Sequence, residues 1–219
     1  MDRAPSDVVV FDGAVVLANG YPLLSGVDLV VERGSLVVLV GANGAGKTSL
    51  LRLMGGLVAL GSGAATVLDV DLVRGDRRQI RRRVGWLGHE GSFYDDLSVR
   101  ENLTFAAAAL RRPIDEMDSV LARVDLSSRA DVSTRMLSAG QRRRLGLAWL
   151  LLRRPELWLL DEPYASLDDD GRRFLDDLLA DVVALGATVV VSAHDPLRGA
   201  RLRPRTLTMA GGTIVGESA

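Results

Sequence analysis

The 219-residue sequence contains no cysteine and only one lysine, Lys47. Without cysteine the chain can form neither disulfides nor thiolate metal sites. No apolar run approaches the roughly 18 residues that a membrane-spanning helix needs, and the first residues lack the basic and apolar regions of a secretory signal. The net charge of −1 argues against a dominant role in binding nucleic acid. We therefore expect a cytoplasmic protein that meets a membrane only through a partner.

Three short, uninterrupted apolar runs, at residues 36–40, 157–160 and 187–191, predict strands buried on both faces of a parallel sheet. Residues 84–87 are a weaker fourth candidate. Each of the three strong runs ends at a polar or glycine-rich turn. Ligands of open α/β sheets bind at the carboxyl ends of the strands. The sequence therefore predicts one site built from three separate segments.

The remaining segments predict other kinds of structure. Residues 8–31 contain short β-rich pieces separated by turns, which is typical of antiparallel strands. Residues 98–152 are mostly helical in pattern, with a capping box at Ser98 and a helix running from Pro113 toward Val124. Residues 205–209 and 213–215 flank two glycines and predict a closing hairpin. Two arginine clusters, at residues 81–83 and 142–144, could contact nucleic acid, but with a net charge near zero we interpret them as solvated helix faces.

The sequence GANGAGKT at residues 41–48 fits the phosphate-binding loop pattern G-x-x-x-x-G-K-[ST]. It follows a predicted strand and precedes a predicted helix at residues 49–54. Glycines let backbone N–H groups surround phosphate oxygens, and the start of the helix adds positive potential. In this pattern Lys47 neutralises phosphates and the Thr48 hydroxyl binds Mg²⁺. An ordinary glycine-rich turn is disfavoured because both flanking elements fit the motif.

Two further segments add polar groups to this site. Asp161 and Glu162 end the apolar run 157–160, where an aspartate can hold Mg²⁺ through water and a second carboxylate can polarise an attacking water. In LSAGQ, at residues 137–141, Ser138 and Gln141 have capping-box spacing and predict a helix start that can face an anion. Alone, the acids would as readily cap a strand and LSAGQ would be an ordinary helix cap. Their occurrence together with the phosphate loop favours the functional interpretation.

In chain order, GANGAGKT, LSAGQ, LWLLDEP, SLD at residues 166–168 and the isolated His194 resemble the nucleotide-binding subunit of ATP-binding-cassette (ABC) transporters. Other P-loop classes have no sequence similar to LSAGQ. The resemblance implies one domain over residues 1–219. It would have a RecA-like α/β P-loop core, an N-terminal antiparallel β-subdomain and a helical subdomain inserted at about residues 90–150. It also implies ATP and Mg²⁺ as cofactors, ATP hydrolysis, and membrane permease subunits as partners at the inner face of the cell membrane.

The same resemblance implies that two copies pair head to tail, with ATP between the phosphate loop of one and the LSAGQ helix of the other. Glu162, His194 and Lys47 would be catalytic, Thr48 and Asp161 would hold Mg²⁺, and Asp168 would couple the two sites. The residues implied to bind ATP are Gly41, Asn43, Gly44, Ala45, Gly46, Lys47, Thr48, Ser49 and His89. Those implied to contact ATP of the partner copy are Ser138, Ala139, Gly140 and Gln141.

Two positions depart from the family pattern. His89 aligns where the family usually has a glutamine, and we hypothesise that His89 takes over its role; the alternatives are Glu90 or neither residue. The aromatic residue that usually stacks on adenine would fall near Leu17 and Ala18, whereas Tyr21 is at least as well explained as a turn residue. We therefore expect weak base stacking and loose discrimination between nucleotides.

Within the ABC family, WLGHE at residues 86–90, LSAGQRRRL and LWLLDEP resemble the ATPase of the haem exporter of cytochrome c biogenesis. Export of another cargo, such as a lipid, drug or polysaccharide, stays open. So does a non-transport ABC ATPase, although such relatives usually carry two cassettes or a long coiled-coil insertion. The LSAGQ sequence disfavours an unrelated P-loop kinase. A coupling helix of a membrane partner is expected to dock around residues 89–96, near Phe93 and Tyr94.

Overall fold

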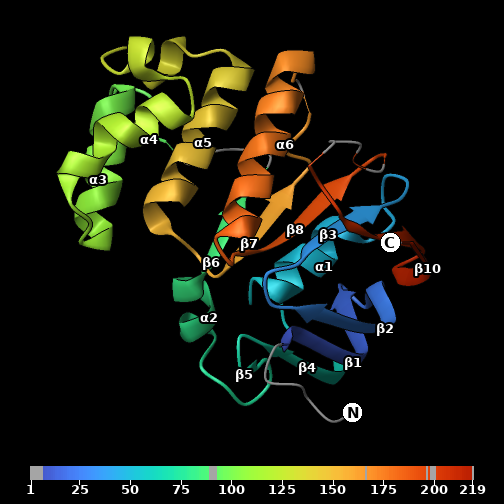
Figure 1. The fold of residues 1–219 in the computed structure, drawn as a ribbon. Coiled ribbons are helices and arrows are strands. Elements are labelled where there is room, and N and C mark those ends of the chain that lie inside the picture. Colours follow the sequence, from blue (N-terminus) through green and yellow to red (C-terminus); the bar gives the residue numbers. More distant parts are fainter. Residues whose placement is uncertain (1–6, 89–92, 166, 196, 198–200, 219) are drawn as a thin grey trace.

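The computed structural model describes residues 7–88, 93–165, 167–195, 197 and 201–218, and its strands form two sheets (Figure 1). One sheet is antiparallel, with the order β2-β1-β4-β5. The other has the order β10-β9-β3-β8-β7-β6 and is parallel except for the pairing of β10 with β9. The strands are β1 (Asp7–Ala18), β2 (Tyr21–Glu32), β3 (Leu36–Val40), β4 (Ser62–Val67), β5 (Val70–Asp71), β6 (Val84–Leu87), β7 (Leu157–Asp161), β8 (Thr188–Ala193), β9 (Arg205–Ala210) and β10 (Thr213–Ser218).

The helices α3, α4 and α5 gather on the side of the molecule away from the antiparallel sheet (Figure 1). The helices are α1 (Lys47–Met54), α2 (Arg77–Arg83), α3 (Val99–Leu110), α4 (Met117–Arg123), α5 (Ala139–Arg153) and α6 (Asp169–Ala184). The predicted helix after Pro113 is divided, because a 3₁₀ turn over Ile114–Glu116 precedes α4. Within the described ranges, no helix combines the length and apolarity needed to cross a bilayer.

The parallel sheet separates two hydrophobic cores. Side chains alternate along a strand, so successive residues point to opposite faces. In β7, Leu157 and Leu159 pack with α1 and the antiparallel sheet, whereas Trp158 and Leu160 pack with α3 to α6. This two-sided burial explains why the strand sequences are continuously apolar. The predicted α/β core, N-terminal antiparallel sheet and inserted helices are confirmed.

An ion pair at Glu156 joins the edge of the parallel sheet to the N-terminal part of the chain. Arg83 donates from Nε to Oε1 at 2.6 Å and from Nη2 to Oε2 at 2.8 Å. Arg33, between β2 and β3, donates to Oε2 at 3.1 Å. The hydrogen bonds from Arg83, against a smaller opposing effect of burial, lower the pKa of Glu156 from 4.5 to about 2. The ionised form is therefore the one that stabilises the fold.

We predict that Glu156→Gln lowers stability at neutral pH by about 1 kcal/mol or less, because the pair is partly solvent-exposed. The folded pKa is depressed, so this stabilisation is complete above about pH 4.5 and is lost as pH falls toward about 2. Urea unfolding from pH 7 to pH 3 should show the difference between wild type and variant shrinking below about pH 4.5. A difference that does not change with pH would contradict the assignment.

Candidate nucleotide site

The loop at residues 41–48 joins β3 to α1 along a path that requires glycine at two positions. Gly41 has φ +152°, and a Cβ there would lie 2.3 Å from the backbone oxygen of Met209. Gly46 has φ +104°, and its Cβ would lie 3.0 Å from the backbone oxygen of Leu23. Gly46 is also the N-cap of α1 and provides no side-chain cap. Backbone N–H groups at such a helix start are suited to bind an anion.

Lys47 supplies positive charge to this loop. The residue is only 5% exposed, and Nζ donates to the backbone oxygens of Gly41 at 2.7 Å and Ala42 at 3.2 Å. The flexible stem of lysine reaches this narrow position more readily than a planar guanidinium would. The structure therefore holds the ammonium group against the predicted phosphate-binding loop.

Hydroxyl and carboxylate groups from α1, β7 and β8 meet next to the phosphate loop. Thr48 Oγ1 donates to Asp161 Oδ1 at 3.1 Å, and Ser192 Oγ donates to the same oxygen at 2.7 Å. Ser192 Oγ also accepts from the backbone N–H of Glu162 at 2.8 Å. Thr48 is the second residue of α1, Asp161 ends β7 and Ser192 lies in β8. The Thr48 and Asp161 oxygens are the hard ligands that Mg²⁺ prefers, so the two residues present fit this ion.

Glu162 adopts an unusual backbone conformation next to this cluster. Its φ is +48°, in the left-handed region, which costs a non-glycine residue about 1–2 kcal/mol. Its N–H bond to Ser192 and its carbonyl bond from Ala165 N at 3.1 Å hold it there. The conformation places Glu162 Oε1 3.5 Å from His194 Nε2, and both line a cavity of about 590 Å³. The strained backbone of Glu162 thus occurs where its carboxylate lies close to the imidazole of His194.

Tyr164 links the loop after Glu162 to α6. Its hydroxyl donates to Asp176 Oδ1 at 2.6 Å and lines the same cavity. Burial, followed by the hydrogen bond to Asp176, raises the pKa of Tyr164 well above its usual range. Tyr164 therefore stays protonated and serves as a fixed hydrogen-bond donor.

The arginines of α5 make specific contacts, so their interpretation as a solvated face was wrong. Arg142 pairs with Asp95 at 2.9 Å, and the Arg144 guanidinium lies 4.7 Å from the centre of the Phe174 ring. Arg143 Nη1 donates to the backbone oxygen of Gly88 at 2.8 Å. Burial lowers the pKa of Arg143, while the charges of Asp161 and Glu162 act in the opposite direction. Arg143 therefore brings positive charge toward the acidic pair.

The LSAGQ segment forms the predicted capping box. Ser138 Oγ accepts from Gln141 N at 3.2 Å, and Ser138 N donates to Gln141 Oε1 at 3.0 Å. Ser138 and Ala139 are exposed at the start of α5, which packs on α3, α4 and β6. Asp168 caps α6 by accepting from Gly171 N at 2.8 Å. LSAGQ thus lies in the helical part of the chain, while the phosphate loop extends from the sheet.

The structure leaves some of the predicted residues untested and adds one that the sequence analysis did not predict. His89, Glu90 and residue 166 lie outside the described residues. Tyr21 is the first residue of β2, pairs with Ala18 across a turn and is 76% exposed, as expected of a turn residue. Ser192 was not predicted from the sequence, although a hydroxyl that ends a run of three valines was a usable signal.

Comparisons with known proteins agree with these observations. A family model described as ABC transporter matches residues 24–165. The cytochrome c biogenesis ATP-binding export protein CcmA of Xanthomonas axonopodis pv. citri is 38% identical over 87% of this chain and 88% of its own length. An ABC transporter ATP-binding protein of Streptomyces coelicolor is 36% identical over 98% of this chain and 83% of its own.

A solved structure from an ABC transporter has a fold similar to that of this chain. The structure of an ATP-binding subunit of an ABC transporter has a TM-score of 0.85 and 24% identity, and the match covers 97% of this chain and 90% of that one. Together with the family match over residues 24–165, these similarities show that the chain belongs to the ABC transporter family, as an ATP-binding subunit.

Proposed function

We propose that this protein hydrolyses ATP to drive export through separate membrane subunits, and that haem for cytochrome c biogenesis is the cargo. The observation that supports the ATPase is that Thr48, next to the loop-bound Lys47, bonds to Asp161 at the end of β7, where Ser192 holds both Asp161 and Glu162. The cargo rests on similarity to CcmA proteins, including one of Rhodopseudomonas palustris that is 39% identical over 84% of this chain. The name of the Streptomyces relative specifies no cargo, so export of another molecule is the alternative.

The proposed chemistry assigns each side chain one task. Lys47 neutralises phosphate oxygens, and Thr48 and Asp161 hold Mg²⁺, which when bound adds positive charge near the transferred phosphoryl group. Water bonds to the γ-phosphorus as the bond to the β-phosphate oxygen breaks, and Glu162 accepts the proton of that water. His194, 3.5 Å from Glu162, contacts the γ-phosphate and holds the water in place. The products are ADP and phosphate.

A second copy of the chain would complete each site. The exposed start of α5 offers Ser138, Ala139, Gly140 and Gln141 to a phosphate bound outside its own chain. Asp168, at the start of α6, would couple the two sites. ATP would then close the pair and hydrolysis would reopen it, because only the γ-phosphate is held by both copies.

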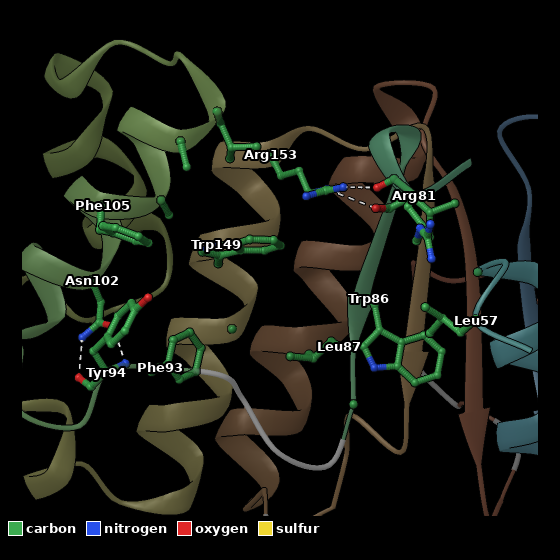
Figure 2. A pocket seen from close by; sticks show the side chains of 17 residues that line it. Leu57, Arg81, Trp86, Leu87, Phe93, Tyr94, Asn102, Phe105, Trp149 and Arg153 are labelled. Carbon is green, nitrogen blue, oxygen red and sulfur yellow. Dashed lines mark hydrogen bonds between the residues drawn. The ribbon is translucent and has the colours of Figure 1, made fainter. Parts of the chain in front are cut away.

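A cavity of about 860 Å³ beside α3 and α5 is the proposed docking site for a membrane subunit (Figure 2). Phe93, Phe105 and Trp149 line it together with Tyr94, whose ring meets that of Phe105 edge-on at 5.2 Å. Two arginines, Arg81 and Arg153, also line the cavity and would favour an occupant with acidic side chains. We assign the cavity to a short amphipathic helix of the permease, which would bring this cytoplasmic chain to the inner face of the membrane.

Replacing Glu162 by Gln should preserve ATP binding and allow a stable ATP-bound dimer, because the amide keeps the side-chain shape but cannot accept a proton. Hydrolysis should fall at least about a hundredfold, in the range of general-base contributions. Size-exclusion chromatography with light scattering and a phosphate-release assay measure the two effects. Rapid turnover by this variant would remove Glu162 from the role of base.

Ser192→Ala should reduce hydrolysis by about ten- to a hundredfold, with ATP affinity nearly unchanged. The variant removes a hydrogen bond to the Asp161 carboxylate, worth about 1.5–3 kcal/mol, and leaves the Glu162 N–H without its acceptor. Steady-state kinetics and nucleotide titration separate the two quantities. Ser119→Ala, which removes an exposed hydroxyl bonded to Glu116, is the matched control and should behave as wild type.

For the cargo, we predict that the protein co-purifies with multi-span membrane subunits encoded beside it and that haem raises the ATPase rate of this complex several-fold. Phe105→Asp should abolish co-purification, whereas Leu185→Asp, at an exposed position outside the cavity, should not. If a lipid, drug or polysaccharide stimulates the ATPase and haem does not, haem is the wrong cargo but the transport function stands. Failure to bind membrane subunits would favour the non-transport alternative.

A further inference from the structure

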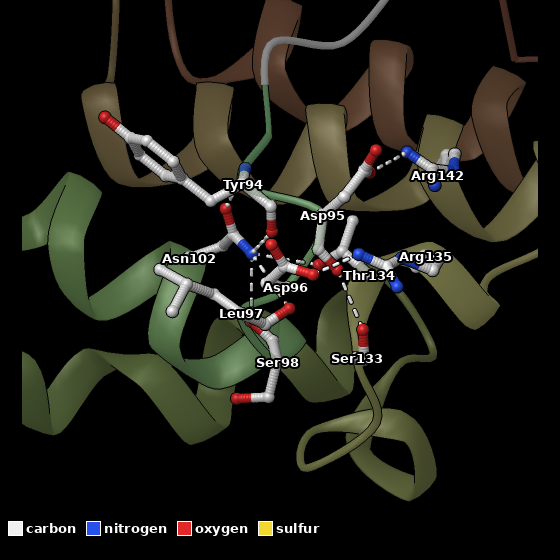
Figure 3. Close-up of polar contacts among 10 residues, drawn as sticks. All are labelled: Tyr94, Asp95, Asp96, Leu97, Ser98, Asn102, Ser133, Thr134, Arg135 and Arg142. Atoms are coloured by element: carbon white, nitrogen blue, oxygen red, sulfur yellow. Dashed lines mark hydrogen bonds and ion pairs between the residues drawn. The ribbon is translucent and has the colours of Figure 1, made fainter.

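A cluster of polar contacts links two residues that line the docking cavity, Tyr94 and Asn102, to the 3₁₀ turn just before Ser138 (Figure 3). We call it the Asn102 cluster; it consists of Tyr94, Asp95, Asp96, Leu97, Ser98, Asn102, Ser133, Thr134, Arg135 and Arg142. Thr134 begins the 3₁₀ turn Thr134–Met136, which ends two residues before Ser138. The cluster therefore spans the distance between the proposed partner site and the proposed phosphate contact.

Asn102, on α3, is the centre of this cluster. It is 6% exposed, and its Oδ1 accepts from Tyr94 N at 2.9 Å. Its Nδ2 donates to the backbone oxygen of Tyr94 at 3.0 Å and to Thr134 Oγ1 at 2.9 Å. The same nitrogen lies within bonding distance of the carbonyls of Leu97, at 3.3 Å, and Ser98, at 3.0 Å. The carboxamide of Asn102 thus connects residues 94–98 to the 3₁₀ turn before LSAGQ.

Further contacts fix the same two segments together. Thr134 N donates to the backbone oxygen of Leu97 at 2.9 Å, and Arg135 N donates to that of Asp95 at 3.1 Å. The Asp95 carboxylate accepts from Arg142 Nη1, in the first turn of α5, at 2.9 Å. Arg135 also pairs with Asp96. Residues 94–97 are therefore bound both to the turn before Ser138 and to the helix after it.

The buried part of the cluster makes this connection stiff. Thr134 is fully buried and Asn102 nearly so. Breaking a hydrogen bond of either residue would cost free energy, because water cannot reach the buried groups to replace the lost partner. The exposed ion pairs contribute less, because solvent screens them. Displacement of Tyr94 should therefore carry the Thr134 turn with it and not break the bonds between them.

We propose that Asn102 and Thr134 are positioning residues that fix the orientation of Ser138 relative to the docking cavity. An occupant of the cavity that moves Tyr94 then moves the start of the LSAGQ helix, and with it the contact to ATP bound by the second copy. This inference rests on the proposed function of the site. It adds a path of named hydrogen bonds by which the partner subunit controls dimer closure.

The test uses a matched pair of variants, Thr134→Val and Thr134→Ser, in the Glu162→Gln protein. Valine keeps the shape but removes the acceptor for Asn102, whereas serine retains it. We expect Thr134→Val to raise the ATP concentration for half-maximal dimerisation about tenfold and Thr134→Ser to leave it near the parent value. Affinity for a fluorescent ATP analogue in the monomer should not change, because the phosphate loop lies outside the cluster.

If Thr134 only stabilised the fold, Thr134→Val would lower the midpoint temperature of unfolding without this selective loss of dimerisation. Unchanged dimerisation of a folded Thr134→Val protein would overturn the proposal, and so would an equal loss in Thr134→Ser. Asp95→Asn, at the exposed end of the cluster, replaces Thr134→Val if the valine variant fails to fold. Asp95→Asn should raise the ATP concentration for half-maximal dimerisation about threefold. No change in that variant would also overturn the proposal.

Amide hydrogen exchange separates this inference from the proposed function. If the Glu162→Gln parent does not dimerise with ATP, the two-copy site is wrong. In that case Asp95→Asn should still speed exchange at residues 94–98 and 138–142 together, with residues 41–48 unaffected. Faster exchange in only one of the two segments would show that they move independently and would reject the positioning role.

Discussion

The candidate nucleotide site is organised around one carboxylate oxygen that two hydroxyls share. Asp161 Oδ1 accepts from Thr48 and from Ser192, and Ser192 in turn holds the backbone of Glu162. Asp161 and Ser192 lie on the neighbouring strands β7 and β8, and Thr48 lies at the start of α1, after the loop that follows β3. The positions of the predicted metal ligand Asp161 and the predicted base Glu162 therefore depend on the register of β7 against β8. A slip of one strand by one residue would reverse its faces and separate Ser192 from Asp161.

The two kinds of basic side chain have different uses. The single lysine lies almost buried against its own loop, where a narrow cation on a flexible stem fits. Several arginines act as planar donors that bridge elements, as Arg83 does at Glu156 and Arg143 does at Gly88. The ion pairs of Arg142 with Asp95 and of Arg135 with Asp96 extend the same pattern to the segment before α3. Charged side chains therefore join separate elements of the fold at several places.

Much of the fold could be predicted from local patterns. The runs that became β3, β7 and β8 were recognisable because burial on both faces leaves no polar alternation. The caps at Ser98 and Ser138 were recognisable because their partners lie three residues away. Strand β4 was missed because SGAATV has neither alternation nor bulk, and it forms by pairing with β1. The arginines of α5 were misjudged because their partners, such as Asp95 and Gly88, are about fifty residues distant in the chain.

The sequence by itself determined which chemical groups are present and which of them are near one another along the chain. The phosphate loop, the Asp161–Glu162 pair and the capping boxes are of this kind, because spacing along one helix or turn fixes their geometry. Only the tertiary structure decided that Ser192 bonds to Asp161, that Glu162 adopts a left-handed conformation, and that Asn102 joins Tyr94 to Thr134. These contacts depend on the packing of separate elements, whose relative positions are set by burial of both faces of the sheet. Short-range sequence patterns carry no record of such distances.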